Sequence, residues 1–144
     1  MPPPFAIAML RAMTTRTATC RCGQLQARCS GEPSHISVCH CRNCQKRSGS
    51  AFAVQARWPE DAVTIAGEAH AWTTLGDSGI PATFHFCPTC GSTVYYRAQA
   101  MPGLVAVAVG AFADPGFPHP TVSNWEERKH AWVGVLGEDI EHHP

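Results

Sequence analysis

Seven of the eight cysteines fall into three short clusters, and this spacing limits the possible folds more than any other feature of the chain. The clusters are C-x-C at 20–22, C-x-C-x-x-C at 39–44 and C-x-x-C at 87–90. Cysteines this close together bridge poorly to one another but bind a common metal ion well. The spacing therefore predicts a fold built around metal sites in a reducing compartment, the cytoplasm, and argues against a disulfide framework.

The first and third clusters together provide four thiols for one ion. In an extended C-x-C segment the two side chains point the same way, and in a C-x-x-C turn followed by glycine the backbone folds over both sulfurs. Two such pairs, far apart in sequence, are the usual composition of a closed tetrahedral zinc site that joins two β elements. We therefore predict a structural zinc ion held by Cys20, Cys22, Cys87 and Cys90.

The second cluster offers three thiols, Cys39, Cys41 and Cys44. Catalytic zinc sites keep three protein ligands and one exchangeable position, whereas structural sites fill all four. A zinc ion with three thiolates is a poor Lewis acid for water but accepts an incoming thiolate. A substrate thiol with a free pKa of about 8.5 would be held there as its thiolate at neutral pH. The cluster thus predicts a catalytic zinc that activates thiols.

Three other residues could fill the vacant position and make the second site structural as well: Cys29, His35 or His40. Cys29 is in phase with Leu25 and Ala27, which predicts a small, buried core side chain. His40 stands between two ligands of an extended segment and should point to the opposite face.

A basic turn follows the second cluster. Arg42, Lys46, Arg47 and Ser50, with the backbone N–H groups of Ser48-Gly49-Ser50, could bind the carboxylates of a small anionic thiol. The alternative is a solvated basic turn that only balances the charge of the site.

The charge of the chain argues against two classes of partner. Eleven basic residues balance eleven acidic ones, and seven thiolates with two Zn²⁺ ions would change the formal charge of zero to about −3. Neither nucleic acid nor a membrane surface is therefore predicted as a partner. The oligomeric state cannot be inferred from the sequence.

The pattern of short strands separated by glycine and proline predicts a mainly β protein. We expect a disordered or overextended start at 1–16, a single zinc domain at 17–140 and a C-terminal tail at 141–144. Within the domain we expect one bulged strand from Thr17 to Ser30, and a strand pair joined near Gly67. A helical turn followed by a strand is expected within 124–135.

The cysteine motifs C-x-C-G, C-H-C-x-x-C-Q-K-x-S-G-S-x-F and F-C-P-x-C-G-S, with VAVGAFADP and a late W-x-x-x-K-x-x-W, resemble one family. It is the family of glutathione-dependent formaldehyde-activating enzymes, which also includes centromere protein V, and the resemblance covers residues from about 17 to about 135. It implies an Mss4-like fold of small antiparallel sheets around two zinc sites, one structural and one catalytic. The same two groups of cysteines are implied as ligands.

The resemblance also implies a reaction. Glutathione and formaldehyde would join to give S-(hydroxymethyl)glutathione, formally a carbon-sulfur lyase run in reverse, with the glutathione thiolate at or beside the second zinc attacking the carbonyl. The partners would be a small thiol and an aldehyde. The competing hypotheses are a non-catalytic zinc-binding structural or interaction protein and a zinc-ribbon nucleic-acid binder, which would need a basic face that the charge balance does not supply.

Overall fold

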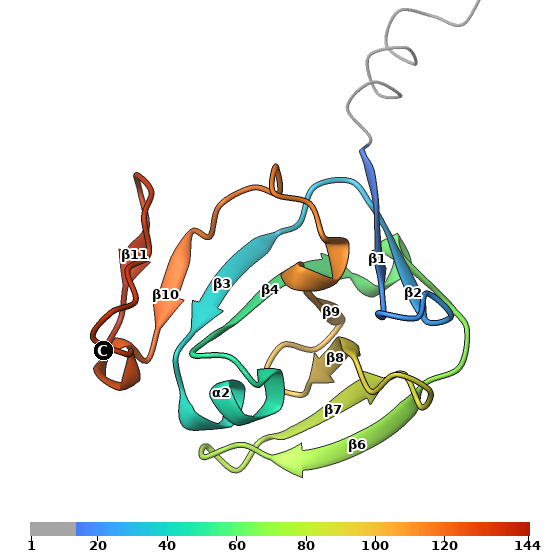
Figure 1. Ribbon diagram of the computed structural model, residues 1–144, viewed down its shortest axis with the longest axis horizontal. Helices are drawn as coiled ribbons and strands as arrows, with labels where there is room; N and C mark the ends of the chain where they lie inside the picture. Colours follow the sequence, from blue (N-terminus) through green and yellow to red (C-terminus); the bar gives the residue numbers. More distant parts are fainter. Residues whose placement is uncertain (1–13) are drawn as a thin grey trace, which may run out of the picture.

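A computed structural model describes residues 14–144, and its chain forms two sheets (Figure 1). The small sheet has the strand order β1-β2-β5, and the large sheet has the order β11-β10-β3-β4-β9-β8-β7-β6. The prediction of a mainly β protein with antiparallel sheets is confirmed, and so is the gathering of the clustered cysteines into two groups that could each hold a metal ion. Only β10 pairs in parallel within the described residues, with β3 on one side and β11 on the other.

The elements are short, as the frequent glycines and prolines predict. The small sheet consists of β1 (Thr15–Thr19), β2 (Gln26–Ser30) and β5 (Val63–Ala66). The large sheet consists of β3 (His35–Cys39), β4 (Ala53–Pro59), β6 (His70–Leu75), β7 (Pro81–Phe86), β8 (Thr93–Ala98), β9 (Leu104–Ala108), β10 (Val122–Asn124) and β11 (Glu141–His142). The helical segments are α2 (Arg42–Ser48), η1 (Glu60–Ala62), η2 (Val109–Phe112) and η3 (Glu126–Arg128). No helix in residues 14–144 is long and apolar enough to cross a membrane.

The hydrophobic core lies between the small sheet and one face of the large sheet. On the large sheet, Trp58 pairs with Val105, and both are fully buried. Ala27 and Cys29 of β2, and Leu25 just before it, are also fully buried in the same cluster. The prediction that these three residues share a core face is confirmed.

The opposite face of the large sheet is polar, although it is also largely covered. Gln55 Nε2 donates to Ser37 Oγ at 2.7 Å, and Arg57 Nη1 donates to the same oxygen at 3.0 Å. Arg57 Nη2 also donates to the Tyr96 hydroxyl at 3.2 Å, across the small side chain of Ala106. Strand alternation separates this polar face from the core face, and α2 packs against it.

Three strand predictions differ from the structure. The segment from Thr17 to Ser30 is an antiparallel hairpin, β1 and β2, because Gly23 at φ +86° supports a turn. β5 and β6 do not pair with each other: β5 pairs with β2 and β6 with β7, so Gly67 joins the two sheets. After Trp125 the chain forms the expected helical turn, η3, but 129–140 has no strand.

The predicted tails also differ where the structure describes them. Most of the 1–16 segment lies outside the described residues, but β1 already begins at Thr15, which pairs with Ser30. At the other end, Glu141 and His142 form β11 beside β10. Backbone pairing therefore extends beyond the predicted domain limits at both ends.

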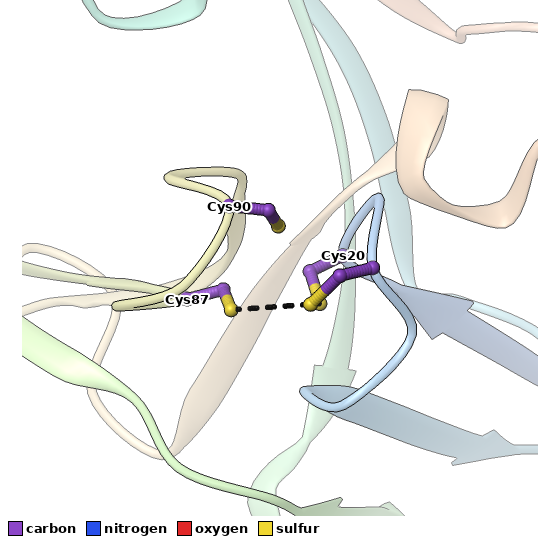
Figure 2. A group of neighbouring side chains, drawn as sticks. Cys20, Cys87 and Cys90 are labelled. Atoms are coloured by element: carbon purple, nitrogen blue, oxygen red, sulfur yellow. Dashed lines mark hydrogen bonds between the residues drawn. The ribbon is translucent and has the colours of Figure 1, made fainter.

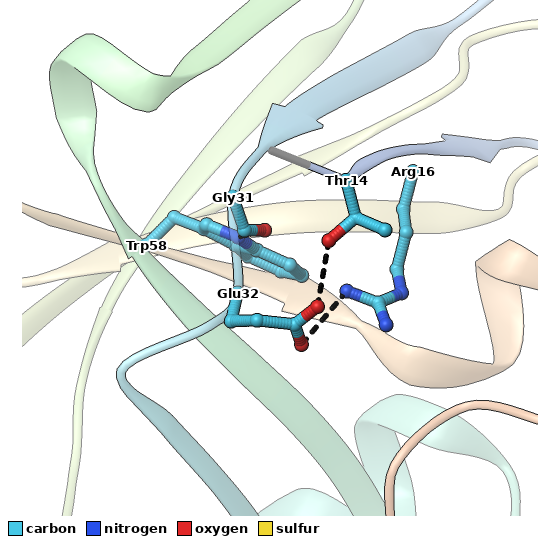
Figure 3. Close-up of polar contacts among 5 residues, drawn as sticks. All are labelled: Thr14, Arg16, Gly31, Glu32 and Trp58. Carbon is cyan, nitrogen blue, oxygen red and sulfur yellow. Dashed lines mark hydrogen bonds and ion pairs between the residues drawn. The ribbon is translucent and has the colours of Figure 1, made fainter. Parts of the chain in front are cut away.

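The end of the small sheet at which β1 begins and β2 ends is connected to the core by the contacts in Figure 3. Trp58 Nε1 donates to the Gly31 carbonyl at 3.0 Å. The Glu32 carboxylate accepts from Thr14 Oγ1 at 2.6 Å and from Arg16 Nη1 at 3.1 Å, and these contacts, the Thr14 hydrogen bond first, lower the pKa of Glu32. Because Glu32 is exposed, the ion pair contributes little; the buried Trp58 is the stronger connection.

Gly67 is predicted to be the least replaceable glycine of the fold. Its φ is +93°, and an added Cβ would lie 1.9 Å from the Gln24 carbonyl oxygen. We expect Gly67→Ala to lower the free energy of unfolding by about 2–4 kcal/mol, measured by urea denaturation. Gly103→Ala is the matched control, since Gly103 has φ +76° and an added Cβ would have nothing within 4 Å. This substitution should lower the free energy of unfolding by about 1–2 kcal/mol. Equal losses would contradict the close approach of Gly67 to Gln24.

Candidate functional site

The first and third cysteine clusters of the sequence come together into one group of four thiols, called the first cluster from here on, which joins two loops from different sheets. Cys20 and Cys22 lie in the turn between β1 and β2, and Cys87 and Cys90 in the turn between β7 and β8. Figure 2 shows Cys87 and Cys90 pointing from their loop toward Cys20. The second turn closes through a hydrogen bond from Gly91 N to the Cys87 carbonyl at 2.8 Å. The two turns thus present their sulfurs to one another.

The four sulfurs of this cluster have the spacing of a tetrahedral zinc site. All four Sγ atoms lie within 4.8 Å of one another. Cys22 Sγ is 3.6 Å from Cys20 Sγ and 3.7 Å from Cys87 Sγ. A tetrahedron with zinc-sulfur distances of about 2.3 Å has sulfur-sulfur edges of about 3.8 Å. The donor set therefore fits a zinc ion.

Neighbouring N–H groups support these sulfurs. Gln24 Nε2 donates to Cys87 Sγ at 2.9 Å, and the backbone N–H of Leu25 donates to Cys20 Sγ at 3.3 Å. Such hydrogen bonds orient thiolate ligands and offset their negative charge. Gln24 also accepts from the Glu68 N–H at 2.9 Å, so the site is connected to the segment around Gly67.

The thiols of this cluster differ in pKa. A backbone hydrogen bond at Gln24 lowers the pKa of Cys22, but its side-chain contacts, that with Cys20 first, raise it overall to about 11. Ser92, through its side chain first and then its backbone, lowers the pKa of Cys90 to about 5. Burial raises the pKa of Cys29 to about 12. Cys29 is therefore a neutral, apolar core group, as the sequence pattern indicates.

The second cluster is formed where β3 ends and α2 begins. Cys39 is the last residue of β3, Cys41 is the N-cap of α2, and Cys44 lies in the first turn. The backbone N–H of Cys44 donates to Cys41 Sγ at 3.3 Å, which caps the helix. The three Sγ atoms lie within 4.8 Å of one another. Three soft donors at this spacing also fit a zinc ion.

The three residues that could complete this cluster have other contacts. Cys29 is in the core. His35 is exposed, and its Nδ1 lies 3.1 Å from Ser34 Oγ. His40 is fully buried, and its Nε2 lies 2.9 Å from Ser123 Oγ. Within residues 14–144 the group therefore contains three potential ligands.

Gln45 holds α2 in place, a role that the sequence analysis missed. Its Nε2 donates to the carbonyls of His40 at 2.7 Å and Arg128 at 3.2 Å, and its Oε1 lies 2.9 Å from His130 Nε2. The helix is thereby fixed to the segment around η3, far away in the sequence. The only sequence signal was the position of Gln45 directly after Cys44.

The predicted anion-binding residues do not all face one space. Lys46 and Arg47 line a cavity of about 410 Å³ together with Cys44. Arg47 also lines a cavity of about 680 Å³ that reaches Cys20 in the first cluster. Arg42 and Ser50 line neither of these two cavities. Arg47 therefore stands between the two spaces.

The Arg47 guanidinium is positioned by aromatic rings. Its carbon lies 4.8 Å from the ring centroid of Phe84 and 5.2 Å from that of Tyr96. Stacking over ring faces leaves the N–H groups at the edge of the guanidinium free to bind an anion. No feature of the sequence marked Phe84 for this role.

A family model described as "Glutathione-dependent formaldehyde-activating enzyme" matches residues 15–132. No curated protein matches the chain. Among solved structures, the crystal structure of a Rhodobacter sphaeroides protein from a structural genomics programme has a TM-score of 0.52 and 20% sequence identity. The match covers 71% of this chain and 90% of that chain, and at this identity it shows a shared fold.

The two clusters should respond differently to the loss of one thiol. We expect Cys87→Ala to lose one zinc ion and to lower the melting temperature by on the order of 10 °C, because its cluster joins two sheets. Cys44→Ala should lose one zinc ion with little change in melting temperature. Native mass spectrometry and thermal unfolding measure both effects.

The matched control is Cys29→Ala, which should keep both ions because Cys29 is a core residue. If Cys44→Ala unfolds as readily as Cys87→Ala, the second site is structural as well.

Proposed function

Since the chain belongs to the family of glutathione-dependent formaldehyde-activating enzymes, we propose that it is a zinc-dependent enzyme of the carbon-sulfur lyase type that acts on a small thiol. The first substrates to test are glutathione and formaldehyde, which would give S-(hydroxymethyl)glutathione. The main support is the three-thiol cluster, whose member Cys44 lines a cavity together with two cations. A closed structural site would need a fourth protein ligand.

The seven clustered cysteines are the proposed zinc ligands. Cys20, Cys22, Cys87 and Cys90 would hold the structural ion, and Cys39, Cys41 and Cys44 the catalytic one. A zinc ion bound by the second group would supply stabilisation of a thiolate at neutral pH.

The surrounding residues would bind and orient the substrates. Lys46 and Arg47 carry positive charge beside Cys44 and suit the carboxylates of an anionic thiol. The aromatic stacking of Arg47 limits its rotamers, so less freedom is lost on binding. Arg42 and Ser50, outside both cavities, are the weaker part of this proposal.

The reaction balances without a further reagent. The thiol loses its proton, its sulfur attacks the carbonyl carbon, and the carbonyl π electrons move to oxygen. The oxygen then takes up one proton, which balances the proton that the thiol released. One carbon-sulfur bond forms, and no oxidant or reductant is consumed. The contribution of the protein is to hold the two reactants together and favour the thiolate.

A reducing compartment such as the cytoplasm suits this function. All eight cysteines are free thiols, and oxidation would remove the proposed ligands. A small thiol and an aldehyde are the proposed partners. The balanced charge gives no reason to propose nucleic acid as a further partner.

Titration of the zinc-loaded protein with glutathione tests the proposal. We expect about one proton released per chain at neutral pH, and faster exchange between formaldehyde and its glutathione adduct by NMR when the protein is present. Arg47→Gln should weaken glutathione binding by roughly five- to tenfold. Arg28→Gln is the control, because Arg28 is exposed on β2 in the small sheet.

Two bound zinc ions with neither proton release nor acceleration would contradict the enzyme proposal. That result would favour the alternative, a non-catalytic zinc-binding structural or interaction protein.

A further inference from the structure

An unusual group of exposed apolar side chains lies on the hairpin of β6 and β7. Trp72 is 56% exposed, Leu75 63% and Ile80 40%. The three residues are close in sequence and lie on one hairpin at the edge of the large sheet. Clustered apolar exposure of this kind marks a binding surface more often than scattered single residues do.

These side chains form one wall of the cavity of about 410 Å³ described above. Phe84 continues the wall along the sheet, since it pairs with Trp72 and the two ring centroids lie 6.2 Å apart. The opposite wall is α2, which presents Cys44 of the second cluster. The apolar space is therefore adjacent to the proposed reacting centre.

The same cavity carries an excess of positive charge. Lys46 and Arg47 line it, and neither forms an ion pair within the described part of the chain. The nearby acidic residue Asp77 accepts a hydrogen bond from Asn43 at 3.4 Å and does not line the cavity. An occupant with an apolar body and one negative charge would complement both features.

The size of the space argues for more than formaldehyde. An aromatic ring the size of benzene fits a cavity of about 150 Å³. The cavity here is more than twice that volume. Formaldehyde has no apolar group, and glutathione has no large apolar side chain, so this pair would leave the apolar wall without a partner.

We propose that the cavity between α2 and the β6-β7 hairpin is a specificity subsite for an arylalkyl carboxylate, the non-reacting part of a larger carbonyl or thiol substrate. Its ring lies against Trp72, Leu75 and Ile80, its carboxylate meets Lys46 and Arg47, and its reacting end faces Cys44. This assignment deepens the proposed function and rests on it for the reaction, whereas the subsite itself can be tested by binding alone.

The test uses three small probes with the zinc-loaded protein, without thiol or aldehyde. 3-Phenylpropanoate has the ring and the charge, 3-phenylpropanol has only the ring, and acetate has only the charge. We expect saturable NMR shifts of the Trp72 indole N–H and the Gly76 amide with 3-phenylpropanoate, and binding about tenfold weaker for each of the other two.

Two variants and a control locate the probe. Leu75→Asp should weaken the binding of 3-phenylpropanoate roughly tenfold, and Lys46→Gln should weaken it roughly fivefold. Leu136→Asp is the matched control, because Leu136 is 88% exposed and does not line the cavity. Leu75 is 63% exposed, so its replacement should leave the fold intact, which the amide spectrum verifies.

The subsite is overturned if 3-phenylpropanoate gives no saturable shift, or if Leu75→Asp binds as well as the unchanged protein. Equal affinity for 3-phenylpropanol would overturn the carboxylate assignment. A positive binding result together with a failed glutathione titration would keep the subsite and reject the proposed glutathione reaction, so the two outcomes are distinguishable.

Discussion

The convergence of four thiols from two loops is the constraint on which the rest of the structure depends. The turn between β1 and β2 belongs to the small sheet, and the turn between β7 and β8 belongs to the large sheet. Their sulfurs lie at the distances that a single tetrahedral ion requires. Gln24 extends this junction, since it contacts Cys87 with its side chain and closely approaches Gly67 with its backbone. The junction thus fixes how the two sheets enclose the core.

The large sheet uses its two faces for different purposes. One face packs Trp58 and its neighbours into the core, and the other carries hydrogen-bonded polar groups beneath α2. Because α2 starts within the second cluster and is held by Gln45, three thiols and two cations are presented together on the polar side. The proposed structural site and the proposed catalytic site are thereby separated.

Arg47 connects the proposed reaction with the proposed specificity. It lies between two cavities, stacks over Phe84 and Tyr96, and has no acidic partner in the described residues. A carboxylate bound by Arg47 could belong to a substrate in either cavity. Membership of the family limits the general chemistry, whereas the apolar hairpin of this chain would determine which substrate is preferred.

The sequence by itself determined the β character, the grouping of the thiols and the burial of Cys29, because each depends on spacings of two or three residues. It misassigned the partners of β5 and β6, since both segments are short and only long-range pairing selects their neighbours. The tertiary structure alone decided that Gln45 clamps α2 and that Trp72 shares a cavity with Cys44. Those contacts join segments about 30 or more residues apart, a range over which local periodicity carries no information.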